Sequence, residues 1–152
     1  MEIIRIPNIN NYTQEIINGD LILTPKEIYI TEDELSKIIL ASSKILKCIV
    51  KNKEEIISNK TKYKSILIDI WKSIPTQRIL QTTTFNMKLT NECGRNGYSW
   101  SPELNLSIQS KDAKNTMKEI LHMVKLNNYS IQISIELLTG QIINYKNIND
   151  GN

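Results

Sequence analysis

Apolar and polar residues alternate most regularly near the end of the chain. The apolar members of the first alternating segment are Tyr129, Ile131, Ile133, Ile135 and Leu137. Alternation with a period of two predicts a β-strand that buries one face. A three-residue loop that ends in a left-handed Gly140 pairs Ile135 with Ile143 on the returning strand. The same register pairs Ile133 with Tyr145 and keeps one face of the predicted hairpin apolar.

Two earlier segments carry apolar residues at helical spacing instead. The first begins at Thr31, which forms a capping box with Glu34, and continues to about residue 58. Its apolar positions are Leu35, Ile38, Ile39, Ile45, Leu46, Ile49, Ile56 and Ile57. The second ends at Pro75, and its apolar positions are Tyr63, Ile66, Leu67, Ile70, Trp71 and Ile74. We expect the two helices to pack as an antiparallel hairpin over residues 31–74, with Trp71 in its core.

The middle of the chain predicts two more strands and a third helix. The strands carry alternating apolar residues, which are Phe85, Met87 and Leu89 in one and Leu104, Leu106 and Ile108 in the other. The helix follows Ser110, with Asp112 in its first turn. Its apolar stripe consists of Ala113, Met117, Ile120, Leu121 and Val124. Asn127 and Asn128 are suited to end this helix in the left-handed conformation.

Residues 1–30 allow several interpretations. Residues 2–6, 21–23 and 27–30 could each form a short strand, whereas residues 12–18 could form a helical turn. Thr24 followed by Pro25 also fits the start of a helix. The sequence leaves these alternatives open.

Together these elements predict one compact α+β domain. An irregular lead-in over residues 1–30 precedes the N-terminal helical hairpin of residues 31–74. Residues 79–145 then form a ββαββ antiparallel or mixed sheet with one helix packed on a face. An exposed final strand could pair with its symmetry mate, so homo-oligomerisation through an edge strand is compatible with this fold.

Composition and charge restrict the classes of function. The 152 residues carry a net charge of +3 at pH 7, and sixteen lysines outnumber three arginines. Strong nucleic-acid binders are usually more basic, with their charge clustered. The densest basic stretch consists of Lys44, Lys47, Lys51, Lys53, Lys60, Lys62 and Lys64. We interpret it as a solvated face of the predicted helices, with contact to phosphates as the alternative.

The ends of the chain and its cysteines indicate the compartment. We find neither a signal peptide nor a transmembrane span, so we expect a cytoplasmic protein that does not bind membranes. Cys48 and Cys93 are the only cysteines, too few for a disulfide framework or a zinc site. We expect Cys48 to be a buried apolar residue on a helix. No metal or cofactor is predicted, and the abundance of Ile, Asn and Lys is typical of an AT-rich genome or mobile element.

Few residues are candidates for catalysis, and the sequence leans away from an enzyme. His122 is the only histidine, and we favour a packed or partly exposed position for it over the role of a base. A nucleophile pair of Cys93 with His122 lacks an evident third group to orient it. Glu92 and Glu103 could face each other as the carboxylates of a hydrolase, but two solvated residues are the favoured interpretation. No glycine-rich loop precedes a helix in the manner of a phosphate-binding motif.

The candidate binding site is the loop over residues 93–103, where glycines, aromatics, an arginine and a carboxylate lie between two predicted strands. Its candidate binding residues are Arg95, Asn96, Tyr98, Trp100 and Glu103. Arg95 offers a planar fork for a carboxylate or phosphate, and Asn96 supplies both a donor and an acceptor. Tyr98 and Trp100 form an apolar anchor on the surface, unless they continue the buried alternation of the following strand into the core.

The sequence therefore predicts a small non-catalytic binding protein that docks this loop on a macromolecular partner, which we expect to be a protein. Its size and lack of motifs suit an inhibitor, such as an immunity protein or a phage-encoded antagonist, by analogy alone. The first alternative is a module that binds a nucleotide or nucleic acid through the same loop and the lysines. The second is a small hydrolase that uses His122, or Glu92 with Glu103.

Overall fold

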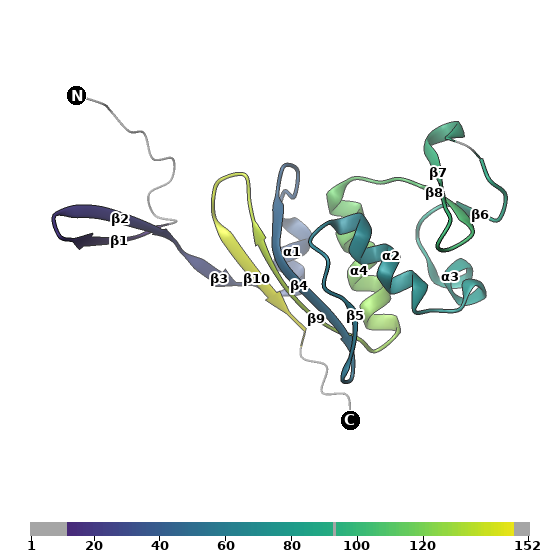
Figure 1. Ribbon diagram of the computed structural model, residues 1–152, viewed down its shortest axis with the longest axis horizontal. Coiled ribbons are helices and arrows are strands. Elements are labelled where there is room, and N and C mark those ends of the chain that lie inside the picture. Colours follow the sequence, from purple (N-terminus) through teal and green to yellow (C-terminus); the bar gives the residue numbers. More distant parts are fainter. Residues whose placement is uncertain (1–11, 93, 148–152) are drawn as a thin grey trace.

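The computed structural model describes residues 12–92 and 94–147 and shows an α+β fold with four α-helices and three sheets (Figure 1). The strands are β1 (Tyr12–Ile17), β2 (Asp20–Pro25), β3 (Glu27–Tyr29), β4 (Lys44–Asn52), β5 (Glu55–Ser58), β6 (Met87–Lys88), β7 (Tyr98–Ser101), β8 (Leu106–Gln109), β9 (Ser130–Glu136) and β10 (Ile142–Lys146). The helices are α1 (Glu32–Lys37), α2 (Tyr63–Lys72), α3 (Thr76–Thr82) and α4 (Ala113–Leu126).

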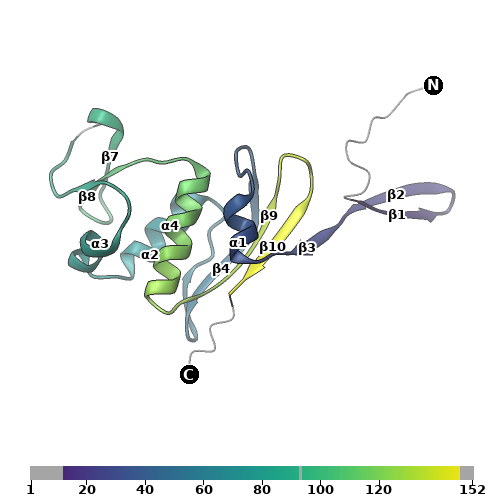
Figure 2. The same cartoon turned by 180° about the vertical axis from the view of Figure 1, so that it is seen from behind.

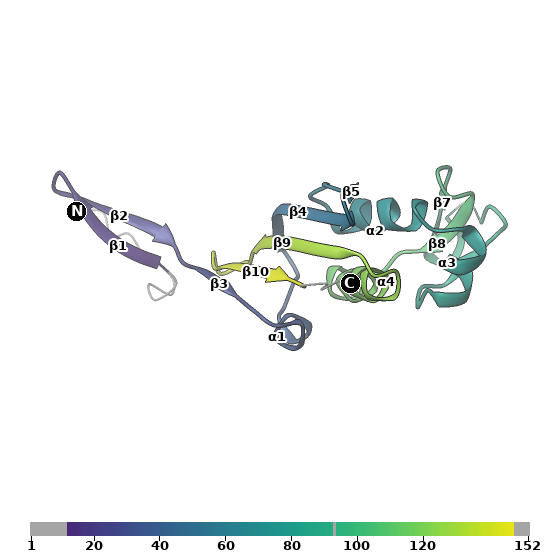
Figure 3. The same ribbon diagram turned by 90° about the horizontal axis from the view of Figure 1, so that it is seen from below.

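The largest sheet has five strands in the order β3-β10-β9-β4-β5. β3 is parallel to β10, and the other neighbours are antiparallel. α4 lies across one face of this sheet, with α1 on one side of it and α2 on the other (Figure 2). No helix of the described residues covers the opposite face, which Figure 3 shows open. The final strand β10 lies between β3 and β9, so the edges of this sheet are β3 and β5.

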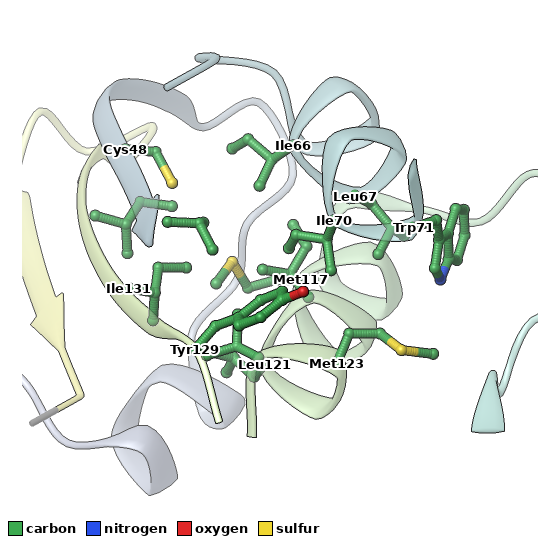
Figure 4. Packing of buried hydrophobic residues seen from close by; sticks show 14 of the residues in the cluster. Cys48, Ile66, Leu67, Ile70, Trp71, Met117, Leu121, Met123, Tyr129 and Ile131 are labelled. Atoms are coloured by element: carbon green, nitrogen blue, oxygen red, sulfur yellow. The ribbon is translucent and has the colours of Figure 1, made fainter. Parts of the chain in front are cut away.

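The register of the five-stranded sheet aligns its apolar residues in rows on the covered face. The rows are Ile45 with Ile135 and Ile143, Cys48 with Ile133 and Tyr145, and Val50 with Ile131. α2 and α4 bury Ile66, Leu67, Ile70, Met117, Ile120 and Val124 against them. Figure 4 shows the side chains of the two helices meeting those of the strands in one continuous core.

A second, three-stranded sheet lies beyond α2 and α4, in the order β6-β8-β7 (Figure 1). Its inner face buries Leu106 and Ile108. Trp71 of α2 meets the ring of Phe85, just before β6, edge to face with a centroid distance of 5.5 Å. These contacts join the small sheet to the helices, so both sheets share one core.

The hairpin of β1 and β2, hereafter the arm, projects from the rest of the molecule (Figure 1). Asn18 and Gly19 form its two-residue turn, and both have positive φ, at 53° and 84°. This is the turn that matches the twist of paired strands, and Asn-Gly is its preferred sequence. The interpretation of residues 12–18 as a helical turn is therefore wrong, and residues 2–6 lie outside the described residues.

The predicted helical hairpin over residues 31–74 is also wrong in its first half. The capping box of Thr31 and Glu34 is present, but α1 ends at Lys37, and β4 and β5 follow it. β4 has a bulge at Leu46, where Ile45 and Lys47 oppose consecutive residues of β9, and β5 has another at Ile57. A bulge inserts one residue, so the spacing of apolar positions becomes three instead of two and resembles a helix.

The other elements show where periodicity succeeded and where it failed. α2 and α4 form as predicted, with Trp71 buried, and β9 and β10 pair in the expected register around Gly140, whose φ is 88°. The predicted ββαββ sheet is wrong, because its first two strands belong to the three-stranded sheet and its last two to the five-stranded sheet. Periodicity does not reveal α3, because Ile79 is its one buried residue and provides no apolar stripe.

Candidate functional site

Arg95 and Asn96 lie on an exposed turn of 3-10 helix, Arg95–Gly97, directly before β7. Gly94 and Gly97 have φ of 80°, and Asn96 also has a positive φ of 54°. Such conformations strain most other residues, which explains why glycine and asparagine occupy this turn. The backbone thus presents both polar side chains to solvent, as the sequence predicts, while Cys93 lies outside the described residues.

Tyr98 and Trp100 lie on the outer face of the three-stranded sheet. Tyr98 pairs with Gln109 and Trp100 with Ser107, whereas the buried Ile108 pairs with Ser99. Residues paired across strands share a face, so the two aromatic side chains point away from the core. Both have intermediate exposure, and Ser107, which pairs with Trp100, is buried, so this face is only partly open to solvent.

Lys88 contacts Tyr98 from β6, on the other side of the central strand β8. Its Nζ lies 5.0 Å from the centroid of the Tyr98 ring, a cation–π arrangement. Lys88 pairs with Ser107, which pairs in turn with Trp100, so all three strands contribute to this face. We call the surface formed by Arg95, Asn96, Tyr98 and Trp100 the aromatic platform.

Hydrogen bonds hold the backbone around the aromatic platform. Gln109 Nε2 donates to the carbonyl of Asn96 at 2.8 Å, and its Oε1 accepts from Asn86 at 2.8 Å. Ser107 Oγ is buried and donates to the carbonyl of Thr90 at 2.7 Å. The turn and the strand are therefore fixed before any partner arrives, which lowers the entropic cost of binding.

Glu103 is separated from the other four candidate residues. It is exposed in the turn between β7 and β8, at the opposite end of β7 from Arg95. Residues 93–103 are therefore not one loop, because β7 occupies its centre. The structure brings together Arg95, Asn96, Tyr98 and Trp100, and leaves Glu103 at the far rim.

Of the two carboxylates suggested for a hydrolase, Glu92 already has partners within the fold. Glu92 Oε1 accepts from Thr90 Oγ1 at 2.7 Å and lies 3.9 Å from Nζ of Lys88. Glu103 is exposed and is not among the contacts of Glu92 in the described residues. This arrangement favours the interpretation of both groups as structural or solvated.

His122 and Glu119 form a clamp that sequence analysis missed in part. His122 Nε2 lies 2.7 Å from the carbonyl oxygen of Thr82, to which it donates. Glu119, only 1 % exposed, accepts from the hydroxyls of Thr83 and Thr84 and from the Thr84 backbone N–H. A buried carboxylate is tolerated where several donors satisfy it. His122 thus ties α4 to the end of α3, and Glu119 ties it to the segment that follows α3, and no spacing in the sequence links these positions.

The lysines of residues 44–64 do not share one surface. Lys44, Lys47 and Lys51 lie on β4, not on a helix. Lys60 binds Asp69 with an Nζ to Oδ2 distance of 2.9 Å, and Nζ of Lys64 lies 3.4 Å from Ser99 Oγ. The predicted helical face of lysines is therefore wrong, and its members divide between the sheet and the start of α2.

Cys48 is buried on β4, where burial raises the pKa of its thiol to about 12. The predicted burial is confirmed, although Cys48 lies on a strand and not on a helix. In the described residues no group of three or more His, Cys, Asp or Glu side chains gathers where it could hold a metal ion. Nor does any helix of residues 12–92 and 94–147 reach the length and apolarity needed to cross a membrane.

Comparisons with known proteins add no family to these observations. No protein-family model matches the chain, and neither curated proteins nor solved structures gave a match.

Proposed function

We propose that this chain is a small cytoplasmic, non-catalytic binding protein whose protein partner docks on the aromatic platform. The observation that carries the proposal is the placement of Tyr98 and Trp100 on the outer face of the small sheet, beside the exposed turn of Arg95 and Asn96. Aromatic and arginine side chains supply most of the binding energy at protein interfaces.

Each residue of the platform has a distinct role in this proposal. Trp100 and Tyr98 provide the apolar contact area at little entropic cost, because the sheet already orders them. Arg95 makes the charge-assisted contact with a carboxylate, and Asn96 adds directional hydrogen bonds. Glu103 adds a rim charge at the other end of β7, where it affects the rate of association more than the affinity.

An inhibitor is the kind of binding protein that this arrangement suits best. The platform is preorganised. The two side chains that come closest to catalytic candidates, His122 and Glu92, already form hydrogen bonds within the fold. A role as an immunity protein or a phage-encoded antagonist from a mobile element remains an analogy to other small proteins that lack catalytic motifs.

The test uses a photo-crosslinking amino acid at position 96 of the full chain, expressed in its host, followed by identification of the captured protein. Affinity for that protein is then measured for Arg95→Ala and Trp100→Ala, with Arg78→Ala as a control at another exposed arginine. We expect each platform variant to bind about tenfold to a hundredfold more weakly, and the control to bind normally. Equal affinities for all four proteins would refute the platform as the binding site.

Two further measurements distinguish the alternatives. Capture that disappears on nuclease treatment, with affinity that falls steeply as salt rises, would indicate nucleic acid. Turnover of a substrate that is lost in His122→Ala or Glu103→Gln, while the fold persists, would indicate a hydrolase.

A further inference from the structure

The arm is exposed on both faces. Every described side chain from Thr13 to Ile22 is exposed, and these include Ile16, Ile17, Leu21 and Ile22. Isolated two-stranded hairpins are marginally stable in water. Bulky aliphatic side chains on such an element indicate that another surface covers it.

The charge of the arm restricts what that surface can be. Glu15 and Asp20 are the ionisable side chains of β1 and β2 apart from a tyrosine, and neither strand contains a basic residue. The cross-strand pairs Glu15–Ile22 and Ile17–Asp20 are separated by one pair, and alternate pairs of a hairpin point to the same face. Both acids therefore share one face with two isoleucines. A complementary surface must combine positive charge with apolar contacts.

The open face of the five-stranded sheet has this combination. Its second row consists of Tyr29, Asn144, Ser134 and Lys47, its third of Lys146, Gln132 and Ile49, and its fourth of Ser130, Lys51 and Ile56. These three rows contain three lysines and no acid, and we call them the lysine face. The acids of this side, Glu27 and Glu136, stand together in the first row with Lys44.

The lysines of this face are available for a partner. Lys47, Lys51 and Lys146 take part in no ion pair within the part of the chain that the structure describes. Tyr29 and Ile56 are exposed beside them. Ser134 donates to Oδ1 of the Asn144 side chain, and Nδ2 of Asn144 is buried with no hydrogen-bond partner among the described residues. An unsatisfied amide on an otherwise bare sheet is consistent with a surface that something covers.

We propose that two copies of this chain exchange arms, so that the acidic arm of each docks on the lysine face of the other. Both complementary surfaces belong to the same chain, and a two-fold axis lets each copy give and receive one arm. Figure 3 shows the arm leaving the β3 edge on the side away from α1 and α4, toward which the lysine face is open.

The dimensions fit this exchange. A six-residue strand is roughly 20 Å long, and Lys47 and Lys51 are roughly 13 Å apart along β4, so one arm spans the face. One face of the arm supplies six residues and the lysine face ten, so each copy contributes sixteen residues, somewhat fewer than the roughly 20–30 a side of a standard protein interface. The aromatic platform lies at the other end of the molecule (Figure 1), so self-association leaves it free. This inference is therefore independent of the proposed function.

The test is sedimentation velocity of the nuclease-treated full chain across a wide range of concentrations. We expect the wild type to form a dimer that weakens with salt. The double variants Glu15→Lys/Asp20→Lys and Lys47→Glu/Lys51→Glu should each dimerise at least about tenfold more weakly. Mixed in equal amounts, the two variants should form a heterodimer, because each arm then faces a sheet of opposite charge.

Matched controls change the same charges elsewhere. Glu54→Lys/Glu55→Lys, at the β4–β5 turn and the first residue of β5, and Lys114→Glu/Lys118→Glu on α4 alter exposed residues outside both surfaces, and should dimerise as the wild type does. A monomeric wild type at every concentration, or failure of the mixed variants to associate, would overturn the proposal. So would nucleic acid that co-purifies with the wild type and the arm variant but is lost from Lys47→Glu/Lys51→Glu, because the lysines would then serve another ligand.

Discussion

Two hairpins of this protein are built from similar local devices and have very different surroundings. The arm turns at Asn18–Gly19 and the β9–β10 hairpin turns through Gly140, each with the left-handed backbone that a tight connection needs. β9 and β10 are then buried against α4 and paired on both sides by β4 and β3. The arm has neither support, although its pattern of hydrogen bonds is equally regular.

This contrast separates the formation of a hairpin from its stability. Turn residues and alternation determine where a hairpin forms, but burial of its apolar face determines how much free energy unfolding costs. The β9–β10 hairpin should therefore open only when the whole protein unfolds, whereas the arm of a single copy should open and close on its own.

The largest expected difference is in thiol reactivity. In the variant Ile16→Cys/Cys93→Ser, one thiol lies on the exposed arm and the other, Cys48, lies next to β9 in the core. Burial raises the pKa of Cys48 from 9.0 to about 12, which lowers its thiolate fraction about a thousandfold near pH 8, and reagents cannot reach it without unfolding. Labelling followed by mass spectrometry should show one fast and one very slow thiol. Two fast thiols would mean that β4 and β9 open as easily as the arm.

Truncation of one aliphatic side chain in each hairpin should give the next largest difference. Ile133 is 1 % exposed, and Ile133→Ala should lower the free energy of unfolding by about 2–4 kcal/mol, because it removes contacts and leaves a cavity. Ile16 is 75 % exposed, and Ile16→Ala should change the free energy of unfolding by less than about 0.5 kcal/mol. Urea unfolding, monitored by tryptophan fluorescence at a concentration where the protein is monomeric, measures both. Similar losses would show that the arm is packed in the monomer.

Substitution of the turn glycines should change stability least, and it compares the two hairpins at equivalent positions. Gly140→Ala should lower the free energy of unfolding by about 1 kcal/mol, because alanine resists a φ of 88°. Gly19→Ala imposes the same strain at a φ of 84°, with no atom of the described residues, apart from its two neighbours in the chain, within 4 Å of the added Cβ. It should speed amide hydrogen exchange in the arm and leave global unfolding unchanged. A loss of global stability in Gly19→Ala would contradict the independence of the arm.

Sequence patterns predicted elements correctly where one continuous period governs burial. α2, α4 and the β9–β10 register all have an unbroken stripe or alternation that faces the core. The strands β4 and β5 escaped prediction because bulges at Leu46 and Ile57 change the period within each strand. The Asn18–Gly19 turn of the arm was a usable signal, since Asn-Gly between aliphatic residues favours a hairpin.

The candidate site was predictable in composition but not in geometry. The glycines around Arg95 and Asn96 correctly indicated an exposed turn. Whether Tyr98 and Trp100 face the core depends on how β7 pairs with β8, and the short turn between them shifts the parity between the two strands. The lysine face depends on pairing between strands far apart in the sequence, which periodicity within one segment cannot reveal.

The strand order of the large sheet also bears on how the protein is made. Its middle is filled by β9 and β10, whose residues leave the ribosome after all the other elements that surround them. At roughly 5–20 residues per second, several seconds separate the synthesis of β4 from that of β9. During this interval β4 lacks the strand that pairs with its Ile45, Cys48 and Val50, and an unpaired apolar strand of this kind is prone to aggregate.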